Sequence, residues 1–330
     1  MSPALALPLF ALSLAVTLAA ARLFARRLDK LGVRFGFPEA LIGVLTAVAA
    51  DGPNVASALF ALIKGAHDVG VGVLVGSNTF QLAAMIGLSG LLAGAVRVAR
   101  ETVLLEGVVG LVITVLATIL LLRWLSPVGA VLLSLLVVVP YLALVVGGQR
   151  LSEQPGSRLR RLAHALHEHP APEQPADASP NPAHHLLALI VLDVLLIVAG
   201  SAGMVEAALS LGGDWHIPNA VLGVLILAPL TSLPNAVTAI RLGLAGRGAA
   251  LVGETFNSNS INLAVGVIGP SLFVTFAALS SVDKQQLAWL LAMTVATVAL
   301  LARRDGMRRL QASVLLVMYF AFVVGTLVGS

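Results

Sequence analysis

Long apolar segments alternate with short polar ones along almost the whole chain. An α-helix needs roughly 20 apolar residues to cross the hydrocarbon core of a bilayer. By this measure the pattern predicts ten membrane-spanning helices, five on either side of one long hydrophilic break. Their expected ranges are 3–25, 39–63, 69–95, 101–122, 126–147, 185–211, 217–242, 248–279, 285–302 and 308–329. The predicted fold class is an all-α polytopic membrane protein.

Composition supports a membrane environment. Of the 330 residues, 58% are hydrophobic and 11% are charged, whereas a soluble domain carries about 25% charged residues. The first apolar segment is expected to be retained, because it is too long for a signal peptide and its basic cluster follows it. Nucleic-acid binding is not expected, since the basic residues are dispersed among short loops. The chain has no cysteine, which excludes disulfides and thiolate metal sites.

The distribution of basic residues predicts the orientation. Seventeen of the 20 Lys and Arg residues lie in or beside the loops that follow the first, third, fifth, seventh and ninth helices. Only Lys64, Arg123 and Lys284 belong to the opposite side. The positive-inside rule then makes the first set of loops cytoplasmic and both termini external. We expect a bacterial plasma membrane, because the chain is compact and rich in Ala, Leu and Val.

Residues 148–184 form the long hydrophilic break, which is expected to be a cytoplasmic linker rich in Pro and Ala. Leu159, Leu162 and Leu166 follow helical spacing, so part of it is either a short helix on the inner membrane surface or a disordered linker. Five of the seven histidines lie in this segment or directly after it. A solvated His-rich linker is a commoner explanation of such a cluster than a metal-sensing site.

The two halves of the chain repeat one another. PEALIGVL (38–45) matches PNAVLGVL (218–225) at an offset of 180, and VGSNTFQLAA (75–84) matches FNSNSINLAV (256–265) at 181. Five helices per half is an odd number, so the second copy must enter the membrane upside down. The predicted domains are two inverted five-helix repeats, 1–147 and 185–330. Inverted repeats are typical of secondary transporters, whose site lies near the bilayer midplane.

Polar residues interrupt the second and seventh predicted helices at DGPN (51–54) and TSLPN (231–235). Gly52, Pro53 and Pro234 are expected to break or kink these helices and free backbone carbonyls. Polar residues of the third and eighth helices are spaced four apart, which places them on one helix face. The candidate transport residues are Asp51, Asn54, Ser77, Gln81, Thr231, Ser232, Asn235, Glu254, Ser258 and Asn262.

These side chains carry the oxygen atoms that hard cations such as Na⁺ and Ca²⁺ prefer. Asp51, Asn54, Asn235 and Glu254 are the expected metal ligands. Ser and Asn also pack membrane helices together, but duplication of both motifs beside prolines favours an ion site. A buried carboxyl such as Asp51 can also carry a proton, so proton coupling stays open. Asp193 and Glu106 lie inside other predicted helices, and Asp193 is either a member of a proton path or an interfacial or helix-packing acid.

The two motifs resemble the alpha-repeats of the sodium/calcium exchanger membrane-region family, the calcium:cation antiporters. There the first element typically reads G-T-S-x-P-E and the second G-S-N-x-x-N or G-S-N-x-x-D; the matching regions here are 38–95 and 217–279. The resemblance implies secondary active cation antiport by alternating access, with the first and sixth helices as moving elements. This chain departs from the family at Asn54 and Asn235, which replace both ion-binding glutamates, and at Ala50 and Asp51, which replace Thr-Ser.

The departures leave several functions open. A site whose only charge is Asp51 suits Na⁺ or H⁺ better than Ca²⁺, since a bare divalent ion in a low-dielectric site needs more carboxylates. The alternatives are therefore a proton-coupled monovalent cation (Na⁺/H⁺) exchanger, or a degenerate, non-transporting membrane protein with a regulatory role. An enzyme is not expected, because no predicted helix holds a paired acid or a His-Glu metal motif. The expected partners are the lipid bilayer and inorganic cations, and no cofactor is expected beyond the transported Na⁺, Ca²⁺ or H⁺.

Overall fold

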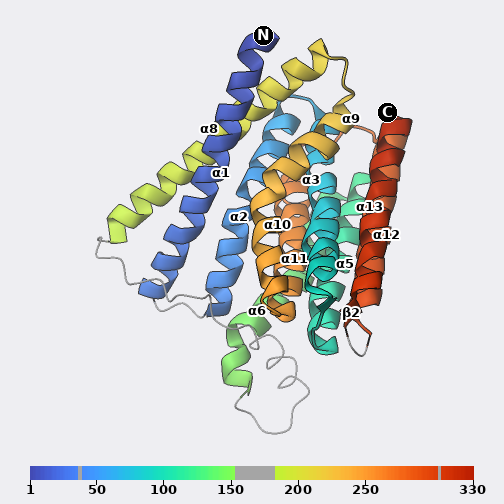
Figure 1. Cartoon of the computed structure of the whole chain (residues 1–330). Helices are drawn as coiled ribbons and strands as arrows, with labels where there is room; N and C mark the ends of the chain where they lie inside the picture. Colours follow the sequence, from blue (N-terminus) through green and yellow to red (C-terminus); the bar gives the residue numbers. More distant parts are fainter. Residues whose placement is uncertain (36–38, 153–182, 304–305) are drawn as a thin grey trace.

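The computed structural model describes residues 1–35, 39–152, 183–303 and 306–330. Within these ranges the chain is an all-α polytopic membrane protein with ten long helical rods (Figure 1). The first-half rods are α1 (Pro3–Arg34), α2 (Glu39–Ile63), the rod of α3, η1 and α4 (His67–Gln81, Leu82–Leu88, Ser89–Ala93), α5 (Arg100–Leu121) and α6 (Pro127–Ser152). The expected surface helix of the linker and His164, His167 and His169 lie outside the described residues.

The second half has the same succession of rods. They are α8 (Ala183–Asp214), the rod of α9, η2 and α10 (Asn219–Val221, Leu222–Leu227, Ala228–Leu244), the rod of α11, η3 and η4 (Gly248–Leu263, Ala264–Ile268, Pro270–Leu272), α12 (Ser281–Leu301) and α13 (Arg309–Gly329). Each predicted helix is present. The first continues beyond residue 25 to Arg34, and the eighth rod ends at Leu272 rather than residue 279.

Among the described residues, eight helices are long and apolar enough by themselves to cross a membrane. The rods built on α2 and α11 carry Asp51 and Glu254. The rod of α3 is the most enclosed, with 94% of its apolar window buried, against 28% for α1 and α8. A central position for polar rods is physically required, because lipid cannot satisfy their hydrogen bonds.

The helices pack closely around the centre because small residues remove the side chains that would separate them. A Cβ added at Gly76 of α3 would lie 2.7 Å from the Cα of Val224 in η2, and one at Gly223 would lie 2.6 Å from the carbonyl oxygen of Val69. Lipid is as apolar as leucine, so such van der Waals contact is a main source of helix association in membranes. These contacts join the first half to the second.

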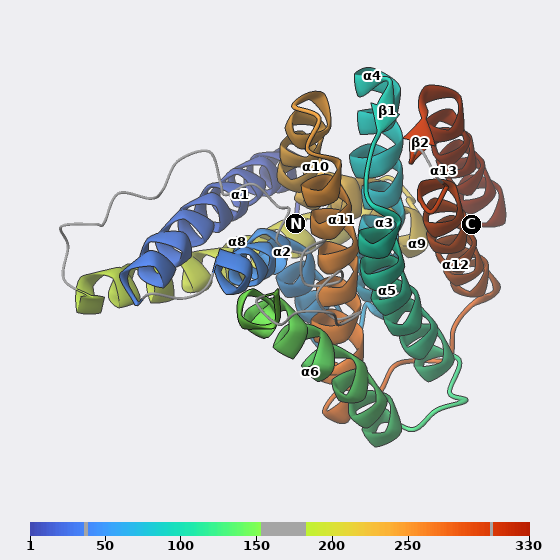
Figure 2. The same cartoon turned by 90° about the horizontal axis from the view of Figure 1, so that it is seen from below.

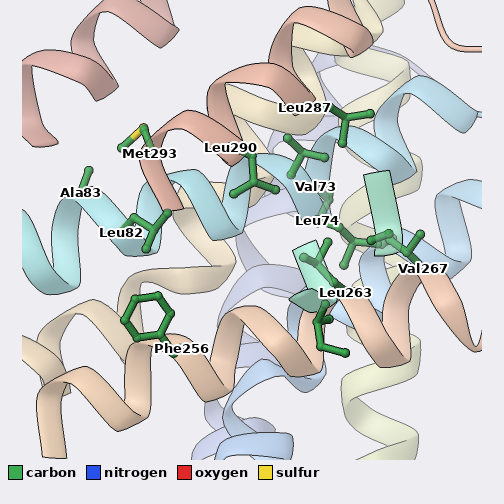
Figure 3. Close-up of a cluster of buried hydrophobic side chains, with 14 of the residues drawn as sticks. Val73, Leu74, Leu82, Ala83, Phe256, Leu263, Val267, Leu287, Leu290 and Met293 are labelled. Carbon is green, nitrogen blue, oxygen red and sulfur yellow. The ribbon is translucent and has the colours of Figure 1, made fainter. Parts of the chain in front are cut away.

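A shared apolar core surrounds this contact. Leu74 and Leu82 from α3 and η1, Phe256 and Leu263 from α11, and Leu290 from α12 are all at most 2% exposed (Figure 3). At one end of the bundle, β1 (Ala95–Val96) pairs antiparallel with β2 (Met307–Arg308). The helix pair α1 and α8 lies to one side of the other rods, as the view from below makes clear (Figure 2). The core therefore holds α2, α3, α10 and α11 in one place, where the polar residues meet.

Candidate ion-binding site

The candidate residues of both halves converge on one buried carboxylate. Asp51 of α2 is 0% exposed. Its Oδ1 accepts hydrogen bonds from the side-chain nitrogens of Asn54 (3.3 Å), Gln81 (3.2 Å) and Asn235 (2.8 Å). Its Oδ2 accepts one from the hydroxyl of Ser258 at 2.5 Å. Two of these four donors belong to each half of the chain, so Asp51 is the point where the halves meet chemically.

A second set of hydrogen bonds surrounds the first. The Ser232 hydroxyl donates to Asn54 Oδ1 at 3.3 Å, and Asn235 also donates to the Ser258 hydroxyl at 3.1 Å. The Asn262 amide donates to Gln81 Oε1 at 3.5 Å. Asn54 and Gln81 thus direct their amide nitrogens at the carboxylate and accept a hydrogen bond from the next group with their amide oxygens. The network is continuous from α2 through α10 and α11 to α3.

Sequence reasoning missed Asn78 and Asn259, which belong to this network. The Asn78 amide donates to the backbone carbonyl of Asn259 at 3.0 Å, and its Oδ1 accepts from Asn262 at 3.0 Å. Both are at most 2% exposed. A signal was present, because the two asparagines occupy the same position of the repeated motif, 181 residues apart.

The side chains of Thr231 and Ser77, both predicted site residues, do not join the hydrogen-bond network around Asp51. Thr231 donates back to its own helix, to the carbonyls of Leu227 (2.8 Å) and Ala228 (3.2 Å). The Ser77 hydroxyl is buried and has no hydrogen-bond partner among the described residues. Ser77 is the repeat counterpart of Ser258, but the counterpart of Asp51 is Ser232. Ser77 therefore lacks the carboxylate that Ser258 finds.

Glu254 brings a second carboxyl to the region. It lies one helical turn before Ser258 on α11, on the helix face that also carries Asn262. Within the described ranges, no three His, Cys, Asp or Glu side chains gather closely enough to hold a metal ion by themselves. A cation here would be held by two carboxyls together with neutral oxygens.

Among the described residues, several neutral oxygen atoms at the site have no hydrogen-bond partner. The buried Ser77 hydroxyl, together with Asn259 Oδ1 and Asn262 Oδ1, has no partner in the described part of the chain. Buried polar atoms are normally paired, and one that is not requires an explanation such as a bound ion or water. Oxygen ligands of this kind fit Na⁺ and Ca²⁺.

The expected helix breaks at the prolines are not observed. Pro53 lies inside the continuous helix α2, and Pro234 inside α10. A broken helix would leave several backbone groups unpaired in hydrocarbon, whereas a continued one loses the single bond that proline cannot make. The departures from α geometry lie elsewhere, in the π-helical segments η1, η2 and η3. Carbonyls freed by a break at Pro53 or Pro234 are therefore not part of this site.

The fold and the site define a class. A polytopic helical membrane protein with a carboxylate, amide and hydroxyl network buried between its two halves has the construction of an ion transporter. The sequence matches the family model described as sodium/calcium exchanger protein over residues 5–147 and 185–328. The chain belongs to that family.

Solved structures show the same fold. One is the sodium-calcium exchanger NCX_Mj soaked with 10 mM Na⁺ and zero Ca²⁺, which is 19% identical, with a TM-score of 0.61 over 98% of this chain and 99% of that one. Another is native YfkE, which is 15% identical, with a TM-score of 0.63 over 97% of this chain and 92% of that one. No curated protein sequence matches this chain.

Proposed function

We propose that the chain is a secondary active cation antiporter that works by alternating access around Asp51. The observation that carries the proposal is the position of this carboxylate, which accepts two hydrogen bonds from each half of the chain. A cation that displaces these donors would take their place between the halves. Family membership supports cation antiport as the activity.

The cation must satisfy the charges of the site. With one carboxyl ionised, a bound Na⁺ leaves the site neutral, and a proton on Asp51 does the same. Ca²⁺ is neutralised only when both Asp51 and Glu254 are ionised, and uncompensated charge is costly in a buried site. We therefore propose Na⁺ or H⁺ as one coupled ion, and place Asp51, Asn54, Asn235 and Glu254 among the cation ligands.

The test is cation flux into proteoliposomes with Ca²⁺, Na⁺ and a pH gradient applied in turn. We expect exchange in the unaltered protein and at least a tenfold loss in Asp51→Asn, which keeps the shape but removes the charge. Asp214→Asn, an exposed acid at the end of α8, is the matched control and should transport normally. Flux that is unchanged in Asp51→Asn would refute the proposal. Absence of any cation-dependent flux would favour the non-transporting alternative.

A proton-coupled Na⁺/H⁺ exchanger is the second candidate, and the roles of Asn54 and Asn235 favour it. Both amides donate to Asp51 and so stabilise its single charge without adding another, whereas the family's glutamates at these positions would add charge. The two candidates differ in whether a Na⁺ gradient drives Ca²⁺ uptake. Na⁺ uptake driven by a pH gradient, with no Na⁺-driven Ca²⁺ uptake, would establish the monovalent exchanger.

A further inference from the structure

A second buried polar cluster lies apart from the network around Asp51. It joins Glu106 of α5, Tyr141 of α6 and Asn257 of α11. Glu106 is 2% exposed and Tyr141 is 7% exposed. The Tyr141 hydroxyl oxygen lies 3.1 and 3.0 Å from the two carboxyl oxygens of Glu106, and 2.8 Å from Asn257 Oδ1.

Counting hydrogens shows what this geometry requires. A tyrosine hydroxyl has one proton to donate and can accept in addition. With Asn257 Oδ1 at 2.8 Å, that proton goes to the amide oxygen. The contact between Tyr141 and Glu106 then needs a proton of its own, which only Glu106 can supply as a carboxylic acid. The arrangement is complete when the Glu106 O–H donates to Tyr141 and Tyr141 donates to Asn257.

Among the described residues, no ion pair or hydrogen bond is seen between Glu106 and a Lys or Arg. Among the described residues of the packed elements, the titratable groups nearest to it are the Tyr141 hydroxyl on α6 and Glu254 farther along α11. The acidic and basic groups of α12, Asp283 and Lys284, lie at its far end, since Gly107 of α5 meets Val298 near the opposite end of α12. The basic residues of α6 and α11 lie at helix ends, Arg150 in the last turn of α6 and Arg247 directly before α11, and η3 and η4 carry no Lys or Arg.

Arg100 and Glu101 on α5 itself are exposed at its first turn. Ionised carboxyls without a partner are disfavoured in the low-dielectric interior of a membrane protein. Proximity to the first turn of α5 gives Glu106 a short route to the side predicted to be cytoplasmic.

Asn257 connects this cluster to the ion site. It lies on α11 three residues after Glu254 and directly before Ser258, which bonds Asp51. Its counterpart in the first repeat is Gly76, where a Cβ would collide with the backbone of Val224. The second copy thus has an amide, directed at Tyr141, where the first copy has only close helix packing.

We propose that Glu106, Tyr141 and Asn257 form a proton-binding site, separate from the site around Asp51, through which cytoplasmic pH acts on transport. On deprotonation the O–H bond of Glu106 breaks and its proton passes to water at the cytoplasmic end of α5. Tyr141 then turns its O–H to the carboxylate, and the Asn257 amide rotates so that Nδ2 donates to the Tyr141 oxygen. The rotation takes place beside Glu254 and Ser258. The link to transport rests on the proposed antiport, whereas the proton site itself does not.

Infrared spectroscopy of the purified protein near neutral pH tests the proton site without measuring transport. We expect the carbonyl stretch of a protonated carboxylic acid that disappears in Glu106→Gln, which is nearly isosteric and neutral. The same band should shift in Tyr141→Phe, which removes the acceptor, and persist in Asp51→Asn. If Glu106→Gln shows the same carboxylic-acid band as the unaltered protein, the proposal is overturned.

Flux measured against cytoplasmic pH tests the link to transport. Glu106→Gln cannot ionise, so its flux should vary less with cytoplasmic pH than that of the unaltered protein. Identical pH profiles would refute the coupling. If no variant transports any cation, the proposed function fails, and the infrared result still decides whether the proton site exists.

Discussion

At the scale of single residues, the feature that sets this site apart is the use of amides around a carboxylate. Asn54, Gln81 and Asn235 all direct their nitrogens at Asp51 Oδ1. A hydrogen bond to a charged acceptor contributes about 1.5–3 kcal/mol, so three of them together with Ser258 hold a buried charge without any cation. A carboxylate at position 54 or 235 would repel Asp51 and require a cation.

Asn235→Asp is expected to make stability depend on divalent ions. The change places a second carboxylate where a nitrogen lies 2.8 Å from Asp51 Oδ1, and like charges this close repel by about 4 kcal/mol or more at an effective dielectric near 20. Ca²⁺ should relieve the repulsion, and a ligand at 100 times its dissociation constant adds about 2.7 kcal/mol. The measurement is thermal unfolding in detergent, with and without Ca²⁺.

The control for this experiment is Asn219→Asp, an exposed asparagine at the start of α9. It should change neither the unfolding temperature nor its response to Ca²⁺. If Ca²⁺ stabilises Asn235→Asp no more than the unaltered protein, position 235 does not belong to a cation site.

At the scale of elements, α1 and α8 form a pair that is held together by close packing and an ion pair. A Cβ at Gly200 of α8 would lie 2.3 Å from Thr17 Oγ1 of α1, so the two helices touch where they cross. Toward the other end of α1, Arg27 forms an ion pair with Asp193 of α8 and donates to the carbonyl of Leu189 at 3.2 Å. This ion pair gives Asp193 a structural role, which is the packing alternative that its position in the sequence left open.

The two partners of this ion pair should contribute unequally to stability. Asp193 is 1% exposed and Arg27 is 22% exposed. Arg27→Gln leaves a buried carboxylate without its partner, which costs about 3–5 kcal/mol. Asp193→Asn should cost less, because the arginine stem is long enough to carry its charge toward the membrane interface. Unfolding of both single variants and the double variant in detergent gives the coupling; equal losses or simple additivity would contradict this account.

The sequence predicted the rods better than their internal geometry. Apolar length and the positions of charges place all ten helices, because crossing a bilayer is a strong constraint on composition. The π-helical turns η1, η2 and η3 have no comparable signature. Of the break or kink expected at Pro53 and Pro234, the break does not occur, because proline shows where one hydrogen bond is lost and not whether the helix continues.

The site was predicted as a set of residues but not as a pattern of contacts. Spacing along α2, α3, α10 and α11 identifies the polar faces, so Asp51, Asn235 and Ser258 were expected to be near one another. Which atom each donates to depends on the rotation and depth of the helices, which follow from packing such as that of Gly76 against Val224. For the same reason Thr231, which bonds its own helix, could not be distinguished from Ser232, which bonds Asn54.

At the scale of the whole molecule, the two halves are similar in sequence but unequal in charge. In the alignment of the two repeats Asp51 matches Ser232, and Glu254 matches Val73. Each half therefore contributes one carboxyl from a different helix. The chain begins and ends at the same end of the bundle (Figure 1), which an even number of crossings requires. β2, which carries Arg308, lies at the opposite end (Figure 1), and we propose that both termini are external.

This orientation can be tested without altering the natural chain beyond one residue, because it contains no cysteine. Ser126→Cys in the loop between α5 and α6 and Ser330→Cys at the C-terminus should react with a membrane-impermeant maleimide in intact cells. Ala245→Cys in the loop between α10 and α11 is equally exposed in the fold but should react only after permeabilisation. The expected contrast follows from Arg241 and Arg247, which flank Ala245 and hold that loop in the cytoplasm. Labelling of Ala245→Cys in intact cells, with Ser126→Cys protected, would show that the molecule has the opposite orientation in the membrane. The route from Glu106 would then lead to the external side.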